Sequence, residues 1–204
     1  MINLTNEARA SKKYVIPDWS ERRIHVLMHV CCGPCAVWPV KRFTEDEGFE
    51  LSTVFYNPNI HPKDEFERRK EGAIQLARSF AVPIAVYNDF MPREWEEFER
   101  ANACELQSGR PKRCEMCYDT RLKFVAKKAK ERGFDAFTTS LLISPYQDHN
   151  LIKMLGEKYQ DMFDIKFYYE DFRSSFRDGQ KMAREMGIYR QKYCGCIISL
   201  SQQN

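Results

Sequence analysis

The segment Ile24-His25-Val26-Leu27-Met28-His29-Val30-Cys31-Cys32-Gly33-Pro34-Cys35 decides the fold. Its first part, residues 24–30, is an apolar run of the length typical of a buried strand. Pro34 is accepted in the first turn of a helix, so the three cysteines are expected at a strand-to-helix junction. Open α/β sheets bind their ligands at such junctions, beyond the carboxyl ends of the strands. The segment therefore predicts an α/β fold with a cysteine site at one edge of the sheet.

Strands and helices alternate along the rest of the chain. Strands are predicted at 24–30, 50–56, 83–87, 136–140 and 165–169, and helices at 34–47, 62–80, 93–103, 114–132, 150–159 and 176–186. This alternation requires crossover connections, and hence a mainly parallel, Rossmann-like sheet with helices on both faces. We expect one α/β domain at residues 22–204 after an N-terminal extension at 1–21. The motifs near residues 31, 57, 114 and 144 all follow predicted strands or begin helices, so they are expected on the carboxyl-end rim of the sheet.

Length and composition fit one globular domain. The chain has 204 residues, of which 43% are hydrophobic. No apolar run approaches the ~18 residues of a membrane span. Residues 1–21 lack the apolar core of a signal peptide, so we expect a cytoplasmic protein that does not bind membranes. In that reducing compartment, eight cysteines favour metal ligation or redox chemistry over structural disulfides.

Positive charge is concentrated beside cysteine pairs. Residues 109–130 carry eight Lys and Arg against two acidic residues, and residues 173–193 carry six against two. This distribution favours a polyanionic partner next to a metal centre. The alternative is a solvated helix face, which we prefer for Lys127, Lys128 and Lys130.

Four cysteines have the number and spacing of a metal site. Cys114 and Cys117 share one face of the first turn of a helix, whose N-terminus favours thiolates. With Cys31 and Cys32 they supply the four thiolates that zinc or an iron–sulfur cluster requires. Adjacent side chains diverge, so Cys31 and Cys32 reach one metal only in a sharply bent loop, which Gly33 permits. Spacing alone does not distinguish zinc from iron–sulfur.

The pair Cys194-Gly195-Cys196 is too tight to hold a metal easily. Its thiols suit a reversible disulfide, because they are near neighbours and the glycine can absorb strain. The alternative is two further metal ligands. Cys104 lies at a predicted helix end and is expected to be a structural thiol.

A rival interpretation comes from Cys32-Gly33-Pro34-Cys35, which is the active-site tetrapeptide of thioredoxin. It suggests a thiol–disulfide oxidoreductase. The chain is about twice as long as a thioredoxin, and that function leaves the remaining cysteines without a role.

Five motifs in order carry a family resemblance. They are Cys31-Cys32-Gly33-Pro34-Cys35, Tyr56-Asn57-Pro58-Asn59-Ile60-His61-Pro62, Arg113-Cys114-x-x-Cys117-Tyr118-x-x-Arg121-Leu122, Leu142-Ile143-Ser144-Pro145-Tyr146-Gln147-Asp148-His149 and Tyr189-Arg190-Gln191-Lys192-Tyr193-Cys194-Gly195-Cys196. In these motifs the chain resembles the cobalamin-independent epoxyqueuosine reductases from about residue 24 to residue 200. The resemblance implies reduction of the epoxide of epoxyqueuosine, at the wobble position of tRNA, to the alkene of queuosine.

The resemblance also implies cofactors and their ligands. A [4Fe-4S] cluster maps onto Cys31, Cys32, Cys114 and Cys117, and a redox-active disulfide maps onto Cys194 and Cys196. An additional iron beside the cluster is implied as well. Cys35 is our candidate ligand for that iron, with Asp64 or His61 as possible helpers, because all three lie near loops at the end of the sheet.

Substrate contacts are expected from basic and aromatic residues beside the cysteine motifs. Phosphates are expected to meet Arg110, Lys112, Arg113, Arg190 and Lys192. Tyr146 or Tyr193 could stack on a base or simply pack in the protein. The reaction needs an electron donor that the sequence does not identify. A non-enzymatic alternative is a zinc-stabilised RNA-binding module, which would bind one zinc and tolerate Cys194→Ser.

Overall fold

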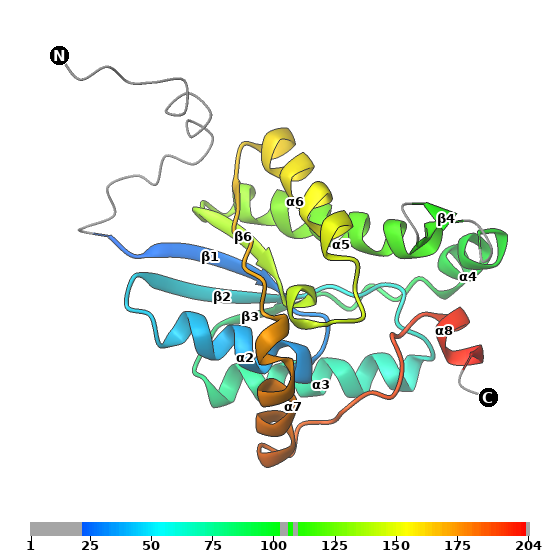
Figure 1. Cartoon of the computed structure of the whole chain (residues 1–204), viewed down its shortest axis with the longest axis horizontal. Helices are drawn as coiled ribbons and strands as arrows, with labels where there is room; N and C mark the ends of the chain where they lie inside the picture. Colours follow the sequence, from blue (N-terminus) through cyan, green and yellow to red (C-terminus); the bar gives the residue numbers. More distant parts are fainter. Residues whose placement is uncertain (1–21, 103–105, 108–109, 203–204) are drawn as a thin grey trace.

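A five-stranded parallel sheet forms the centre of the protein. The computed structural model describes residues 22–102, 106–107 and 110–202 (Figure 1). The strands are β1 (Ile24–His29), β2 (Phe49–Phe55), β3 (Ile84–Val86), β6 (Ala136–Thr139) and β7 (Lys166–Phe167), in the order β3-β2-β1-β6-β7. Every neighbouring pair in this sheet is parallel. The predicted Rossmann-like α/β fold is confirmed. The predicted extension at 1–21 and Cys104 lie outside the described residues.

Helices cover both faces of this sheet (Figure 1). One side carries α2 (Gly33–Thr44), α3 (Lys63–Ser79) and α7 (Phe176–Glu185), and the other carries α5 (Lys112–Glu131) and α6 (His149–Phe163). The smaller elements are α4 (Pro92–Ala101), α8 (Ile197–Ser201), the short 3-10 helices η2 (Ser140–Ile143) and η3 (Arg173–Ser175), and the two-stranded β4 (Leu106–Gln107) and β5 (Arg110–Pro111). Within the described ranges, no helix is both long and apolar enough to span a membrane.

The strand order reverses between β1 and β6. The chain runs outward from β1 to β2 and β3, and then returns to place β6 on the other side of β1. At the carboxyl ends of these two strands, His29 Nδ1 lies 3.0 Å from Thr139 Oγ1, and the backbone N–H of Cys31 donates to Ser140 Oγ at 3.0 Å. Doubly wound sheets bind ligands in the crevice at such a reversal. The first cysteine motif therefore lies at the position that this topology favours for a site.

Gly33 is needed for close helix packing. Its φ is outside the left-handed region, so it does not supply the bend expected from the sequence. A Cβ at this position would lie 2.7 Å from the carbonyl oxygen of Gly72 on α3 and 2.6 Å from Ile188 Cγ2. The absence of a side chain lets α2 begin directly against α3, with the cysteines at that contact.

Several element boundaries differ from the prediction. The helix expected at 34–47 ends at Thr44, because Glu45 already serves as its C-cap, and Gly48 lies in the following turn, where its N–H bonds Asp46. Only two residues of the strand expected at 165–169 pair with β6, since β7 is an edge strand beside a short neighbour. The helix expected at 150–159 continues to Phe163. The elements α8, β4 and β5 were not predicted.

Candidate metal and redox site

Seven cysteines meet on one cavity. It has a volume of about 350 Å³ and lies beyond the carboxyl ends of β1 and β6. Three separate parts of the chain supply its thiols, namely Cys31, Cys32, Cys35, Cys114, Cys117, Cys194 and Cys196. These are all the cysteines in the part of the chain that the structure describes. Cysteines up to 165 residues apart in sequence therefore form one site.

The first three thiols form the tightest group. The sulfurs of Cys31, Cys32 and Cys35 all lie within 4.8 Å of one another, and those of Cys31 and Cys32 are 3.7 Å apart. Ser140 Oγ donates to Cys31 Sγ at 3.3 Å, and Gln191 Nε2 donates to Cys32 Sγ at 2.9 Å. Donors aimed at sulfur stabilise negative charge there. This arrangement suits thiolates that ligate a metal.

Proximity makes these thiols compete for ionisation. Hydrogen bonds from Cys32 and Cys35 lower the pKa of Cys31 well below its usual value. The same contacts with Cys31 raise the pKa of Cys32 and of Cys35, because a second negative charge would stand beside the first. Burial lowers the pKa of the neighbouring His29 to about 4, so its imidazole is neutral and does not supply a positive charge. Full ionisation of the group needs a cation, which a bound metal would provide.

The loop after β2 holds the second cysteine pair in place. Cys114 and Cys117 lie in the first turn of α5, and Arg121 follows one turn later. The guanidinium of Arg121 contacts Cys117 Sγ, while its Nε donates to Asn57 Oδ1 at 2.9 Å and its Nη2 to Asn59 Oδ1 at 2.7 Å. These bonds are buried, so they fix the start of α5 relative to β2.

The third group of thiols lies on residues 189–196, which we call the C-terminal segment. Cys194 is exposed and Cys196 is partly buried, and both line the cavity. Gly195 between them has φ +124°, a conformation that favours glycine. Gln147 Nε2 lies 4.0 Å from Cys194 Sγ, and its Oε1 accepts from Tyr118 Oη at 2.7 Å. The pair of thiols thus lines the same cavity as the other cysteines.

Comparison with known proteins assigns the family. The family model for epoxyqueuosine reductase QueH matches residues 26–202. The chain belongs to the QueH family. The epoxyqueuosine reductase QueH of Thermotoga maritima is 34% identical over 182 residues, which cover 87% of this chain and 91% of that protein. That of Streptococcus pyogenes serotype M1 is 34% identical over 194 residues, which cover 91% of this chain and 74% of that protein. The predicted family and oxidoreductase class are confirmed.

A solved structure supports the fold alone. A predicted subunit of a tRNA methyltransferase from Methanocaldococcus jannaschii superimposes with a TM-score of 0.50 at 12% identity, covering 79% of this chain and 75% of that one. At this identity the likeness confirms the α/β architecture and carries no function.

The QueH-family structure gathers most, but not all, of the predicted site residues. Besides the cysteines, the predicted site residues that line the cavity are Arg113, Tyr146, Lys192 and Tyr193. Arg190 is exposed and donates to Gln180, and Lys112 is exposed at the start of α5. Arg110 lies in β5, and its side chain lies outside the described part of the structure.

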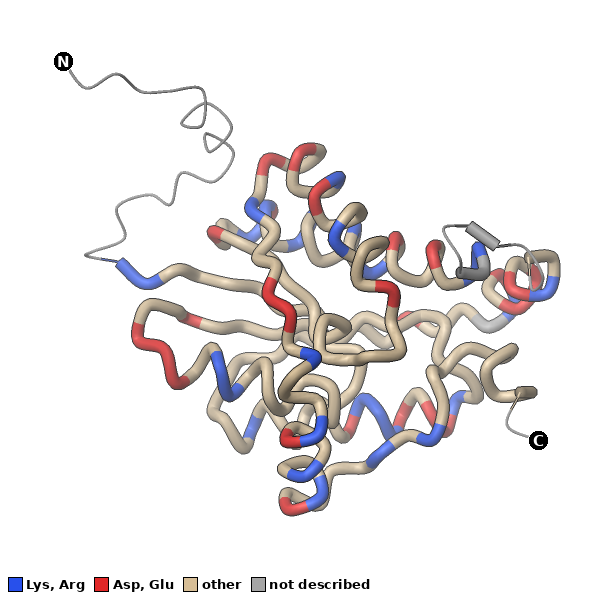
Figure 2. Tube along the Cα trace, in the orientation of Figure 1, with Lys and Arg blue, Asp and Glu red and all other residues tan. Residues whose placement is uncertain are grey.

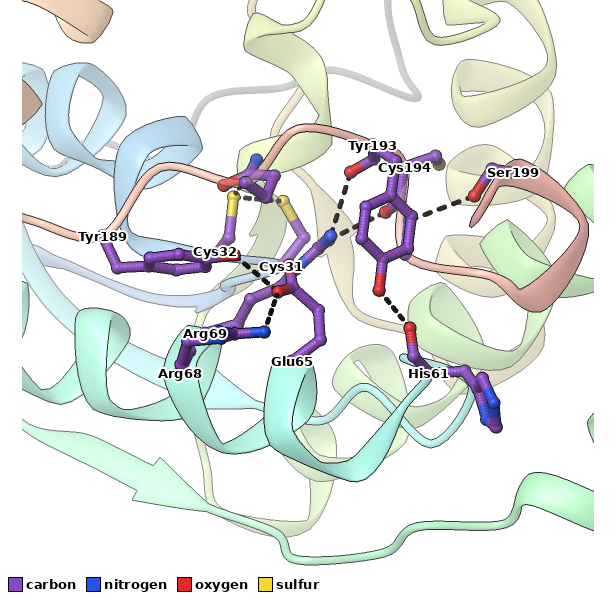
Figure 3. Close-up of polar contacts among 12 residues, drawn as sticks. Cys31, Cys32, His61, Glu65, Arg68, Arg69, Tyr189, Tyr193, Cys194 and Ser199 are labelled. Carbon is purple, nitrogen blue, oxygen red and sulfur yellow. Dashed lines mark hydrogen bonds and ion pairs between the residues drawn. The ribbon is translucent and has the colours of Figure 1, made fainter. Parts of the chain in front are cut away.

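Asp64 and His61 do not reach the cavity. The exposed side chain of Asp64 lies on the first turn of α3. His61 lines a separate small pocket with Glu99 and Ile197. Only the backbone of His61 faces the cysteine segment, since its N–H donates to Gly195 O at 2.8 Å and its carbonyl accepts from the Tyr193 hydroxyl (Figure 3). Proximity in sequence to a sheet-end loop did not predict where these side chains point.

The residues that the sequence analysis missed include Arg69, Gln191 and Glu65. Arg69 and Gln191 line the cavity, and Glu65 pairs with Arg69 behind it. Glu65 and Arg69 are four residues apart on α3, a spacing that usually indicates an exposed ion pair. Their burial depends on the C-terminal segment that covers them, which the spacing does not reveal. Gln191 lies within a family motif, but its amide gave no chemical signal.

Proposed function

We propose that this QueH-family chain reduces the epoxide of epoxyqueuosine in tRNA to the alkene of queuosine, using an iron–sulfur cluster and a Cys194–Cys196 dithiol. The observation that carries this proposal is the meeting of seven thiols on one cavity where the strand order reverses. The cavity volume of about 350 Å³ is in the range of small-ligand sites.

The donor set fits a cysteine-held cluster. We assign Cys31, Cys32, Cys114 and Cys117 as its ligands, because the family resemblance implies this set and both pairs line the cavity at the start of a helix. When bound, such a cluster would supply electrons one at a time. Cys35 would remain as a nearby thiol, and we propose it as a ligand of an additional iron. The hydrogen bonds that reach Cys31 and Cys32 suit thiolate ligands.

The two thiols of the C-terminal segment can supply the two electrons and two protons that the reaction consumes. Oxidation of Cys194 and Cys196 forms one S–S bond and releases two electrons and two protons. The epoxide accepts these, both of its C–O bonds break, the oxygen leaves as water and a C=C bond forms. A reductant must then restore the dithiol. The need for tRNA and for this reductant would place the activity in the cytoplasm.

Residues around the cavity would hold the substrate and the thiols in position. Burial raises the pKa of the Tyr118 hydroxyl, so it keeps its proton and donates a hydrogen bond to Gln147 Oε1. This contact fixes the Gln147 amide, whose Nε2 points toward Cys194. Leu141 and Phe176 add apolar surface that limits water in the cavity.

An aromatic side chain and basic residues mark the tRNA-binding side. Tyr146 lines the cavity, is 72% exposed and packs edge-on against Phe176, so it is our candidate for stacking on a base. The hydroxyl of Tyr193 is hydrogen-bonded to His61 and its ring lies over Arg69, which favours a packing role.

Figure 2 shows basic residues on the segment that joins α7 to α8. We propose that Arg190 and Lys192 on that segment, with Lys112, Arg113 and Arg110, meet phosphates.

The thiol–disulfide oxidoreductase interpretation fits the structure less well. Cys32 and Cys35 are 1% and 8% exposed, whereas a dithiol that reacts with other proteins needs an accessible sulfur. The zinc-stabilised RNA-binding module is tested by the metal content and by Cys194→Ser.

Turnover on the modified tRNA tests the proposal. Protein purified without oxygen is incubated with epoxyqueuosine-containing tRNA and a chemical reductant, and digested nucleosides are quantified by mass spectrometry. We expect queuosine with the wild type and with Cys104→Ser, the matched control, because Cys104 is assigned to neither the metal site nor the redox pair. Cys194→Ser and Cys117→Ser should give at most a few per cent of that product. Full activity in Cys194→Ser would contradict the proposed dithiol.

A further inference from the structure

A buried ion pair on α3 lies beside the C-terminal thiols. Arg69 is 3% exposed and Glu65 is 1% exposed, and Arg69 Nε donates to Glu65 Oε1 at 2.7 Å. Burying two charges costs more than their attraction returns unless further hydrogen bonds complete the site. The partners of the remaining Arg69 donors therefore decide whether this buried pair is stabilised.

Those donors bind two consecutive carbonyls of the cysteine segment (Figure 3). Arg69 Nη1 donates to the carbonyl of Cys194 at 2.8 Å, and Nη2 donates to that of Tyr193 at 2.9 Å. One guanidinium thus joins α3 to a loop more than 120 residues later in the chain. A lysine could not make all three bonds, because the planar fork of arginine supplies their directions.

Neighbouring contacts hold the same segment against α3. A Cβ on Gly195 would lie 2.8 Å from Arg69 Nη1, so only glycine permits this approach. The hydroxyl of Tyr189 donates to Glu65 Oε2 at 2.6 Å, which ties the start of the segment to the same ion pair. Glu65 thus holds one end of the C-terminal segment through Tyr189, and Arg69 holds the other end through two backbone carbonyls.

We propose that Arg69 is a positioning residue for the Cys194–Cys196 redox pair. It holds the backbone of the two thiols at the cavity and keeps a guanidinium, itself paired with Glu65, beside them. This inference rests on the proposed dithiol function. Because thiols can become negative and a disulfide cannot, a nearby cation favours the reduced form. A purely structural role would change the stability of the protein without changing this equilibrium.

The thiol–disulfide equilibrium tests this inference directly. Full-length protein with its metal, kept without oxygen, is equilibrated in glutathione buffers of different ratios. Free thiols are then alkylated, and the fraction of Cys194–Cys196 disulfide is measured by peptide mass spectrometry. The measurement is made at pH 7 and at pH 9. Arg69→Gln is expected to shift the equilibrium constant toward the disulfide, with the larger shift at pH 9, where more thiolate is present. Arg69→Lys, which keeps the charge, should shift it less.

Two further variants complete the test. Arg78→Gln is the matched control, because Arg78 is an exposed arginine on the same helix and its loss changes net charge equally. It should behave as the wild type. Glu65→Gln keeps Arg69 but removes the carboxylate that offsets its charge, so it should shift the equilibrium toward the dithiol, and it serves if Arg69 variants do not fold. A wild-type constant in Arg69→Gln, or in Glu65→Gln where Arg69→Gln does not fold, overturns the inference. A wild type that forms no Cys194–Cys196 disulfide at any ratio overturns the proposed dithiol as well.

Discussion

A methyl group added at Gly33 should destabilise the protein and disturb the cysteine group. In Gly33→Ala the new Cβ would meet Gly72 O at 2.7 Å and Ile188 Cγ2 at 2.6 Å. The end of the Ile188 side chain can move, but the carbonyl of Gly72 belongs to the backbone of α3 and cannot move without its helix. Overpacking of this kind costs about 1–3 kcal/mol, and the backbone contact places this case near about 3 kcal/mol.

Gly72→Ala is the matched control, because Gly72 lies on the facing helix and its Cβ would meet the same isoleucine. That contact is 3.4 Å, which is ordinary van der Waals distance. Gly72 lies inside α3, where replacing glycine by alanine stabilises a helix by about 0.8–1 kcal/mol. The two variants are therefore expected to differ in free energy of unfolding by about 4 kcal/mol, in opposite directions from the wild type.

Urea unfolding followed by circular dichroism measures this difference, on oxygen-free samples of matched iron content. Separately, Gly33→Ala should retain less iron as purified, since α2 carries Cys35 and begins beside Cys32. The reasoning is refuted if Gly33→Ala is as stable as Gly72→Ala.

Three further predictions concern other parts of the site. Arg121→Met leaves the side-chain oxygens of Asn57 and Asn59 buried without donors, which costs about 1–3 kcal/mol each. Urea unfolding should therefore show a lower free energy of unfolding, and iron analysis a lower iron content. Unchanged values would contradict the bridging role of Arg121. Burial lowers the pKa of His149, so the unfolded chain takes up a proton first as the pH falls below about 6.5. The free energy of unfolding therefore decreases toward pH 5, and it should decrease less between pH 7 and pH 5 in His149→Gln. An equal decrease in the two proteins would refute this. Tyr146→Ala should raise the KM for tRNA about tenfold while Met154→Ala, at another exposed residue, does not; equal KM values would remove the stacking role.

The fold was largely predictable because its determinants are local. The apolar run at 24–30 and the alternation of strand and helix patterns predict a parallel sheet, which the structure contains. The short elements were not predictable. Helix α8 has five residues and packs against α4, so tertiary contact rather than helix propensity decides it. Two-residue strands such as β7 likewise depend on a neighbour for their hydrogen bonds.

The thiols of the site were predictable from residue type, but their surroundings were not. Cysteine at strand ends and helix starts predicts a shared site, and all seven described thiols do line one cavity. Arg69 looks like any residue of an exposed helical ion pair until the C-terminal segment covers it. His61 was expected at the site, yet its backbone bonds that segment and its side chain turns to another pocket. Side-chain direction depends on such long-range contacts.

The most direct test of the account is the iron and acid-labile sulfide content of protein purified without oxygen. We expect brown protein with about four iron and four sulfide per chain or more, retained in Cys104→Ser and lost in Cys117→Ser. That result would tie the metal to the cavity thiols. A colourless wild type that carries one zinc per chain and no sulfide would contradict the assignment of an iron–sulfur reductase site.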